Sequence, residues 1–217
     1  MKLEVILQLL ATLFVAIAAI GCAIQLYPYS LRMRKGAPVI AIAIIGFTAV
    51  VTGLQFVFPE VLNALQRNRE ALLAGEWWRT VTPLFVQVYG WWHACVNGVA
   101  AIFLCPLAER LYGKRLLILY FVPGMLGEII AYFWKPNGAG SSLGIAGVMG
   151  ALFAYTFLQR QMLSRSSRLF AICGIAGGAV QCAARDIHGP PILLGVLLAS
   201  VMTIFWPSPI RDWKAPV

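Results

Sequence analysis

Long runs of apolar residues, each about as long as a membrane-crossing helix, dominate this chain. Seven such runs alternate with short polar stretches that are rich in Arg and Lys. About 20 apolar residues in a helix are enough to cross the hydrocarbon core of a bilayer. The runs predict helices over residues 4–27, 38–59, 91–112, 115–134, 142–159, 167–184 and 189–207. The pattern therefore predicts an all-α integral membrane protein.

The composition supports the same class of protein. Apolar residues make up 60% of the 217 positions, charged residues make up 12%, and the mean hydropathy is +0.81. A soluble domain carries roughly 25% charged residues. This chain has too few polar residues to cover a surface in water, so we expect lipid to be its main solvent.

The basic residues between the apolar runs predict the orientation of the helices. Cytoplasmic loops collect Lys and Arg, and one set of connections holds eleven of them while the other holds six. The larger set is Arg32, Arg34, Lys35, Arg110, Lys114, Arg115, Arg160, Arg165, Arg168, Arg211 and Lys214, and the smaller set is Lys2, Arg67, Arg69, Arg79, Lys135 and Arg185. We therefore place the larger set and the C-terminus inside. The net charge of +9 then reflects topology and contact with anionic lipid, not binding to nucleic acid.

The first apolar run allows a second interpretation, a cleaved signal peptide, because Ala-Ile-Gly-Cys22 resembles a lipoprotein cleavage site. However, the run at 4–27 is long for a signal, and cleavage would leave Arg32 and Arg34 outside. We favour a retained helix.

The connection at 60–90 is expected outside the membrane core. Its stretch 60–78 mixes Val and Leu with charged residues and ends in two tryptophans. Such a segment is expected to lie in the membrane interface, and a solvated external loop is the alternative.

The few polar side chains in the apolar runs are candidates for function, because a polar group inside a bilayer is costly. The only histidines, His93 and His188, lie at the outer ends of predicted helices. Asn97 follows His93 by four residues and shares its helix face. Ser141 and Ser142 begin another helix at the same outer side.

Serine, histidine and asparagine are the residue types that hydrolysis by a nucleophilic serine uses. A serine becomes a nucleophile only when a base lies within reach and fixed donors stabilise the oxyanion. His188 could be the base, with His93, Asn97 and the backbone N–H of Ser142 as donors. Each signal is weak alone, because a serine can cap a helix and a histidine can be a structural hydrogen-bonding group.

Small residues mark the two helices that would carry the serine and the base. They are Ala146, Gly147 and Gly150 after Ser142, and Gly195 and Ala199 after His188. Small faces let two membrane helices approach closely. We expect these helices to bring the hydroxyl and the imidazole together, and ordinary helix packing without chemistry is the alternative.

Five short motifs follow one another within residues 38–207. They are Gly75-Glu76-Trp77-Trp78-Arg79, His93-xxx-Asn97, Glu109-Arg110-Leu-Tyr-Gly113, Gly140-x-Ser142 with Gly147 and Gly150, and Asp186-Ile-His188 with Gly195. Together they resemble the motifs of the rhomboid family of intramembrane serine proteases.

The resemblance implies a rhomboid-like six-helix bundle over residues 36–210. An additional N-terminal transmembrane helix and a basic linker over 1–35 would precede it, and a short cytoplasmic tail over 211–217 would follow. It implies an endopeptidase that hydrolyses peptide bonds in or near the transmembrane segments of single-pass membrane proteins. The short loops and the lack of an organelle-type leader favour a bacterial inner membrane, with the site on the extracytoplasmic side.

The resemblance also implies the roles of the site residues. Ser142 and His188 would form a catalytic dyad without a third member. His93, Asn97 and the backbone N–H of Ser142 would form the oxyanion hole, and no cofactor or metal is implied.

Gln87 or its neighbours lack the additional histidine that some members of the family carry just before the His-xxx-Asn motif. Three further positions depart from the family pattern. Leu143 stands where a glycine is usual, Ala146 stands where an aromatic residue usually supports the histidine ring, and Pro191 replaces a glycine. They keep open an alternative, a catalytically inactive rhomboid-like protein that binds transmembrane clients. A transporter is a more distant alternative, because the runs lack a polar pathway and an inverted repeat.

Two further residues carry open alternatives. Ser141 is the rival nucleophile, but its helix face would hold larger residues than that of Ser142. Glu128 lies in the middle of the run at 115–134 and is expected to be a neutral, hydrogen-bonded acid that faces the bundle, because no charged partner appears at that depth in the sequence.

Overall fold

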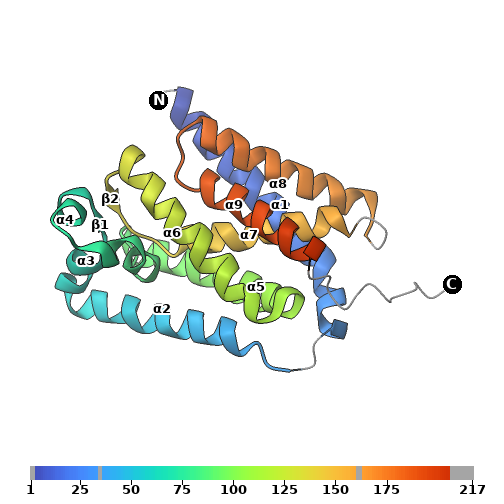
Figure 1. Ribbon diagram of the computed structural model, residues 1–217, viewed down its shortest axis with the longest axis horizontal. Coiled ribbons are helices and arrows are strands. Elements are labelled where there is room, and N and C mark those ends of the chain that lie inside the picture. Colours follow the sequence, from blue (N-terminus) through green and yellow to red (C-terminus); the bar gives the residue numbers. More distant parts are fainter. Residues whose placement is uncertain (1–2, 34–35, 160–162, 206–217) are drawn as a thin grey trace.

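A computed structural model describes residues 3–33, 36–159 and 163–205, and all seven predicted runs are helices in it (Figure 1). The long helices are α1 (Leu3–Met33), α2 (Val39–Val57), α5 (Gly90–Tyr112), α6 (Leu116–Trp134), α7 (Ser142–Leu158), α8 (Arg165–Ala183) and α9 (Gly189–Phe205). Most ends agree with the prediction to within two residues, and α1 continues further, to Met33. The predicted all-α class is confirmed.

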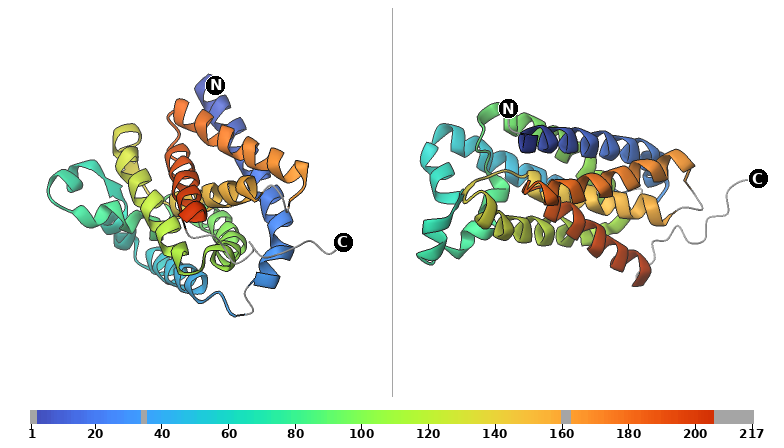
Figure 2. Two further views of the ribbon diagram at one scale, coloured as in Figure 1. Left: turned by 45° about the vertical axis from the view of Figure 1, so that its right-hand side comes forward. Right: turned by 90° about the horizontal axis from the view of Figure 1, so that it is seen from above.

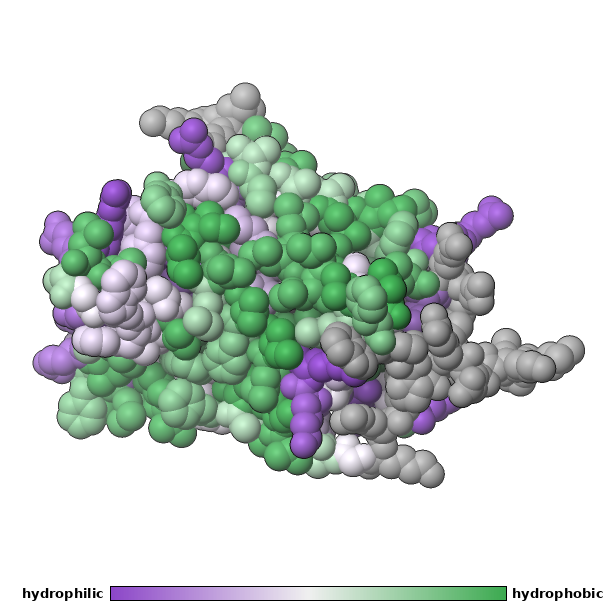
Figure 3. All heavy atoms as spheres, viewed as in Figure 1, coloured by the Kyte–Doolittle hydropathy of each residue, from purple (hydrophilic) through white to green (hydrophobic). Residues whose placement is uncertain are grey.

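Hydrophobic residues cover the middle of the molecule, and hydrophilic residues gather toward the two ends of the bundle (Figure 3). The segments Val5–Arg32 and Val39–Val57, and the run Gly90–Trp134 formed by α5 and α6, are long and apolar enough to cross a membrane. The helices α7 and α9 are shorter and also apolar. The chain is therefore an integral, multi-pass membrane protein.

The connection at 60–90 is a folded lobe at one end of the bundle (Figure 1). It contains α3 (Pro59–Leu65), β1 (Arg67–Asn68), α4 (Arg69–Leu73) and two 3-10 turns, η1 (Trp77–Thr80) and η2 (Thr82–Phe85). The strand β1 pairs antiparallel with β2 (Asn137–Gly138), which lies just before α7. The lobe is thus tied to the segment that leads into the helix of Ser142. Its position in the membrane interface stays a prediction.

Glu109, from the Glu-Arg-Leu-x-Gly motif, caps a helix other than its own. Its carboxylate accepts hydrogen bonds from the backbone N–H groups of Ile40, at 3.2 Å, and Ala41, at 2.7 Å, in the first turn of α2. Those N–H groups have no acceptor within their own helix, and a negative charge there is favourable. This motif therefore fixes α2 against the end of α5.

Glu128 on α6 has a charged partner, contrary to the expectation from the sequence. Its carboxylate pairs with the guanidinium of Arg67 on β1, and Arg67 Nε also donates to the carbonyl oxygen of Lys135 at 2.8 Å. The two side chains are 1% and 2% exposed. Arg67 belongs to the 60–90 lobe, so the pattern of apolar runs gave no indication that it would lie beside Glu128.

The helices α7 and α9 pack backbone against backbone, as their small faces predict. A Cβ atom on Gly150 would overlap the carbonyl oxygen of Ile192, and one on Gly195 would overlap that of Gly147. Only a residue without a side chain allows such an approach. The close contact is therefore confirmed, and it sets the separation of the two helix starts where Ser142 and His188 lie.

Replacing Gly150 by alanine is expected to destabilise the protein by about 1–3 kcal/mol, the usual cost of overpacking. The reason is that the obstructing atoms belong to the backbone of α9 and cannot rotate away. Thermal unfolding in detergent micelles measures the effect. Gly46→Ala on α2 is the matched control, because a Cβ there meets nothing within 4 Å. Equal stability of the two variants would contradict the prediction.

The N-terminal helix α1 lies along α8 (Figures 1 and 2). Near the C-terminal end of α8, Gln8 Nε2 donates to the carbonyl oxygen of Ala184 at 2.7 Å, and Gln181 Nε2 donates to Thr12 Oγ1 at 3.1 Å. These contacts hold the end of α8 only a few residues before His188. The helix α1 thus braces the segment that carries the candidate base.

Candidate active site

The hydroxyl of Ser142 and the imidazole of His188 meet at one end of the bundle. His188 Nε2 lies 3.0 Å from Ser142 Oγ, which is a hydrogen-bond distance. Ser142 is the first residue of α7, and His188 directly precedes α9. The glycine-mediated contact of the two helices therefore produces this pair.

His93 reaches the same place from α5. A Cβ atom on Gly140 would lie 3.1 Å from His93 Nε2 and 3.2 Å from Ser142 Oγ. Both side chains thus border the small space that this glycine leaves open. The buried Nδ1 of His93 has no hydrogen-bond partner among the described residues. The ring also contacts that of Tyr89 in a tilted arrangement, with ring centroids 5.2 Å apart.

Asn97 belongs to a chain of amide hydrogen bonds next to the pair. Its Nδ2 donates to Gln87 Oε1 at 2.8 Å, and Gln87 Nε2 donates to Ser141 Oγ at 3.0 Å. The backbone of Gln87 is bonded in both directions to the side chain of Gln55 on α2, at 2.8 and 2.9 Å. Asn97 uses one of its two amide hydrogens in this chain, so the other can serve a second acceptor.

Gln87 received no role from the sequence, because it lies in an irregular stretch without helical periodicity. Two signals marked the position: its polar character in a run of apolar and aromatic residues just before α5, and the additional histidine that some members of the family carry there.

The two neighbouring serines have different surroundings. Ser141 is 3% exposed and accepts its hydrogen bond from Gln87, whereas Ser142 faces His188. Within the described residues, only Ser142 of the two has a hydrogen bond to an imidazole. This placement favours Ser142 over Ser141 as a nucleophile.

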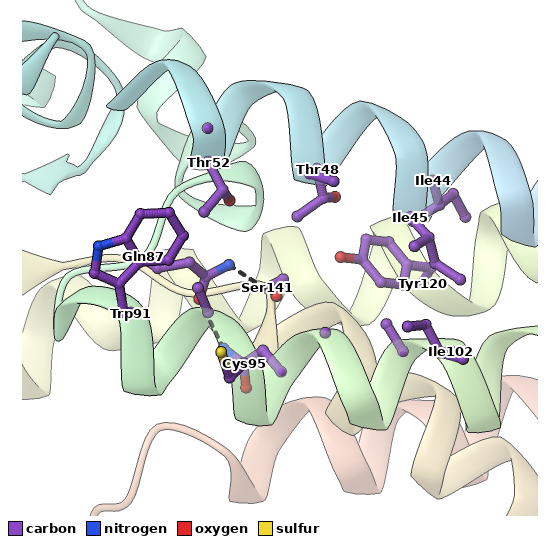
Figure 4. A pocket seen from close by; sticks show the side chains of 16 residues that line it. Ile44, Ile45, Thr48, Thr52, Gln87, Trp91, Cys95, Ile102, Tyr120 and Ser141 are labelled. Atoms are coloured by element: carbon purple, nitrogen blue, oxygen red, sulfur yellow. Dashed lines mark hydrogen bonds between the residues drawn. The ribbon is translucent and has the colours of Figure 1, made fainter. Parts of the chain in front are cut away.

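A cavity of about 300 Å³ lies beside the amide chain, between α2 and α5. Figure 4 shows Gln87 toward one end of it, Ser141 near its middle with the hydrogen bond from Gln87 dashed, and Ile102 and Tyr120 toward the other end. Most of its wall is apolar. An apolar hollow with a few convergent polar groups is the usual form of a binding site.

The three departures from the family pattern are accommodated in the helix packing. Leu143 is 1% exposed and belongs to the main hydrophobic core, and Ala146 packs in a second apolar cluster with Ile192. Pro191 packs against Gly127 of α6, with ring carbons 3.1–3.4 Å from the position of a Cβ there. None of the three comes between Ser142 Oγ and His188 Nε2, which remain at hydrogen-bond distance.

Asp186 contacts the other side of the His188 ring. Its Oδ1 lies 2.7 Å from Nδ1 and also accepts the backbone N–H of His188 at 2.9 Å. The resemblance implies a dyad with no third member, and in the sequence Asp186 stands out only as part of the Asp186-Ile-His188 motif. A carboxylate two residues before a candidate base was the one available signal.

Known proteins match the part of the chain that holds these residues. Residues 74–208 match the family model described as the Rhomboid domain. Rhomboid protease GluP of Bacillus subtilis (strain 168) is 34% identical over 110 residues, which are 49% of this chain and 22% of that protein. Putative rhomboid protease YdcA of the same organism is 30% identical over 95 residues, which are 42% of this chain and 47% of that protein. Each match spans less than half the length of the relative.

Proposed function

This chain belongs to the rhomboid family, and from that premise we propose that it is an intramembrane serine endopeptidase. It hydrolyses peptide bonds in or near the transmembrane segments of membrane proteins, with Ser142 as nucleophile and His188 as general base. The 3.0 Å contact between Ser142 Oγ and His188 Nε2 carries the proposal. The two relatives named as rhomboid proteases support it.

The chemistry follows from this contact. His188 Nε2 takes the proton of Ser142 Oγ while Oγ bonds to the carbonyl carbon of the scissile peptide. The C–N bond then breaks, and Nε2 gives the proton to the leaving amine. Water then attacks the acyl ester while His188 Nε2 takes its proton. Nε2 returns this proton to Ser142 Oγ as the ester bond breaks, which restores the free serine. These steps use no cofactor.

The oxyanion of the tetrahedral intermediate is stabilised by His93, Asn97 and the backbone N–H of Ser142. His93 borders the same gap as Ser142 Oγ, and Asn97 has a second amide hydrogen. Ser142 begins α7, so its N–H has no acceptor within the helix and points from the positive end of the helix dipole. Three donors of this kind are suited to a developing negative charge.

The substrate is a single-pass membrane protein, and the site faces the extracytoplasmic side of a bacterial inner membrane. Among the described residues, the bundle end that holds the site carries the smaller set, and the opposite end carries the larger set. The described members of the smaller set are Arg67, Arg69, Arg79, Lys135 and Arg185, and those of the larger set are Arg32, Arg110, Lys114, Arg115, Arg165 and Arg168. Residues 36–210 form the six-helix core, 1–35 form the added helix and linker, and 211–217 form a cytoplasmic tail. The tail and the last core residues, 206–217, lie outside the described residues.

Labelling with a fluorophosphonate tests the proposal, because the reagent bonds to an activated serine oxygen. The wild-type protein is expected to react and Ser142→Ala is not. Ser141→Ala is the matched control and should still react, because Ser141 faces Gln87 instead of an imidazole. Thermal unfolding checks that each variant is folded.

Two results would change the assignment. Loss of labelling in Ser141→Ala, with labelling kept in Ser142→Ala, would move the nucleophile to Ser141. A folded wild-type protein that never reacts would favour the inactive, client-binding alternative.

A further inference from the structure

The imidazole of His188 lies between two oxygen atoms. Nε2 faces Ser142 Oγ at 3.0 Å, and Nδ1 faces Asp186 Oδ1 at 2.7 Å. The Asp186 side chain is 9% exposed, and that of His188 is 33% exposed. The carboxylate therefore sits on the inner side of the ring, where little water competes for it.

The backbone around Asp186 holds the carboxylate in place. The N–H of Asp186 donates to the carbonyl oxygen of Gln181 at 2.8 Å, and its own carbonyl accepts the N–H of Gly189 at 3.2 Å. Arg185 adopts a left-handed φ of 52°, which turns the chain from α8 toward His188. Gln8 of α1 bonds the carbonyl of Ala184 at 2.7 Å. Three helices thus fix the turn that aims Asp186 at the ring.

Asp186 remains ionised at neutral pH. Burial raises the pKa of its carboxyl, but the hydrogen bonds and charge of His188, with the charge of Lys135, leave the pKa below its ordinary value. The carboxylate is therefore protonated only when the pH falls below the ordinary range of an aspartate. Among the described residues, Lys135, Cys182 and His93 are the other titratable groups found to interact electrostatically with this pair.

Other support for the ring is sparse in the part of the chain that the structure describes. Ala146 lies one turn after Ser142 and presents only a methyl group. The aromatic contacts found among the described residues include none to His188. Among the described residues, the side-chain hydrogen bonds of the imidazole are therefore those to Ser142 and Asp186.

We propose that Asp186 is a positioning residue that completes a Ser142–His188–Asp186 triad, an inference that rests on the proposed serine chemistry. Its carboxylate accepts the Nδ1–H of His188 and so keeps the lone pair on Nε2, opposite Ser142 Oγ. When Nε2 takes the serine proton, the same carboxylate stabilises the imidazolium. Asp186 keeps its negative charge throughout, because the proton passes from Oγ to Nε2 and on to the leaving amine.

Asp186→Asn is the discriminating variant. Asparagine keeps an oxygen that can accept the backbone N–H of His188, so the turn is retained, but the charge is lost. The rate constant for reaction of Ser142 with a fluorophosphonate is expected to fall by at least about 10²-fold. The acid limb of its pH profile should move to lower pH, because the imidazolium loses its anionic partner. Glu70→Gln, which removes an exposed carboxylate on α4, should change neither.

A second variant separates charge from folding. Asp186→Glu keeps the carboxylate and is expected to recover part of the rate and the wild-type position of the acid limb. If Asp186→Asn reacts at the wild-type rate with a superimposable pH profile, the triad is overturned and the endopeptidase assignment stands. If the wild-type Ser142 reacts but a transmembrane test substrate is not cleaved, the endopeptidase assignment is overturned. The rates of fluorophosphonate labelling in the wild-type protein and the Asp186 variants then decide whether Asp186 belongs to a triad.

Discussion

Replacing His188 by alanine is expected to lower the rate of peptide-bond cleavage by on the order of 10⁴-fold or more. Without the imidazole, the hydroxyl of Ser142 keeps its proton and is a poor nucleophile. Among the side-chain hydrogen bonds of the described residues, Ser142 Oγ takes part only in the one to His188. The loss of His188 therefore leaves the hydroxyl without a hydrogen-bonded base, since His93 borders the same gap but makes no hydrogen bond to Ser142 Oγ among the described residues.

Cleavage of a transmembrane test substrate in proteoliposomes measures this loss. The variant should fold, because the His188 side chain is one-third exposed and leaves no internal void. His93→Ala is the comparison, since removal of one oxyanion donor costs on the order of 10²-fold. Losses of the same size in the two variants would contradict the assignment of His188 as base and His93 as donor.

The helices were predictable from the sequence because their cause is local. A membrane helix needs its apolar residues in one continuous run, so α2, α5, α6 and α7 could be located from the sequence alone. The contact of α7 with α9 was also predictable, since Gly150 and Gly195 repeat along one face of each helix. A periodic pattern records which face is buried, and these faces point at each other.

The pairing of Ser142 with His188 was predictable for the same reason. Both residues lie at the starts of helices whose small faces pack together. The contact of Asp186 with the ring was not. Its direction depends on the turn at Arg185 and on bonds from three helices, none of which leaves a periodic signal. The link from Asn97 through Gln87 also passes through an irregular segment.

The partner of Glu128 could not be predicted either, because it is contributed by a different part of the chain. A helix pattern reports the depth of a residue along its own helix. Arg67 reaches that depth from the short strand β1, which folds back beside α6. Such a contact depends on the tertiary path of the 60–90 lobe, so only the structure identifies it.

Breaking this ion pair is expected to have a large effect on stability. Glu128→Ala should lower the free energy of unfolding by about 3–5 kcal/mol, because Arg67 is left as a buried charge without its counter-ion. Thermal and chemical unfolding in detergent measure the change. Glu60→Ala, an exposed carboxylate in the first turn of α3, is the matched control and should change stability little. Similar unfolding of the two variants would contradict the prediction.

The double variant Arg67→Leu/Glu128→Leu shows whether the pair acts through the unpaired charge. Replacing both partners leaves no unpaired buried charge, so the double variant should be more stable than Glu128→Ala. The double-mutant cycle should then give a clear coupling energy. Because Arg67 also bonds the carbonyl of Lys135 close to β2, loss of the pair should loosen the segment that leads to Ser142. We therefore expect Glu128→Ala to slow fluorophosphonate labelling of Ser142 at temperatures where the protein is still folded. If labelling keeps the wild-type rate in that folded variant, the ion pair holds the lobe without positioning the serine.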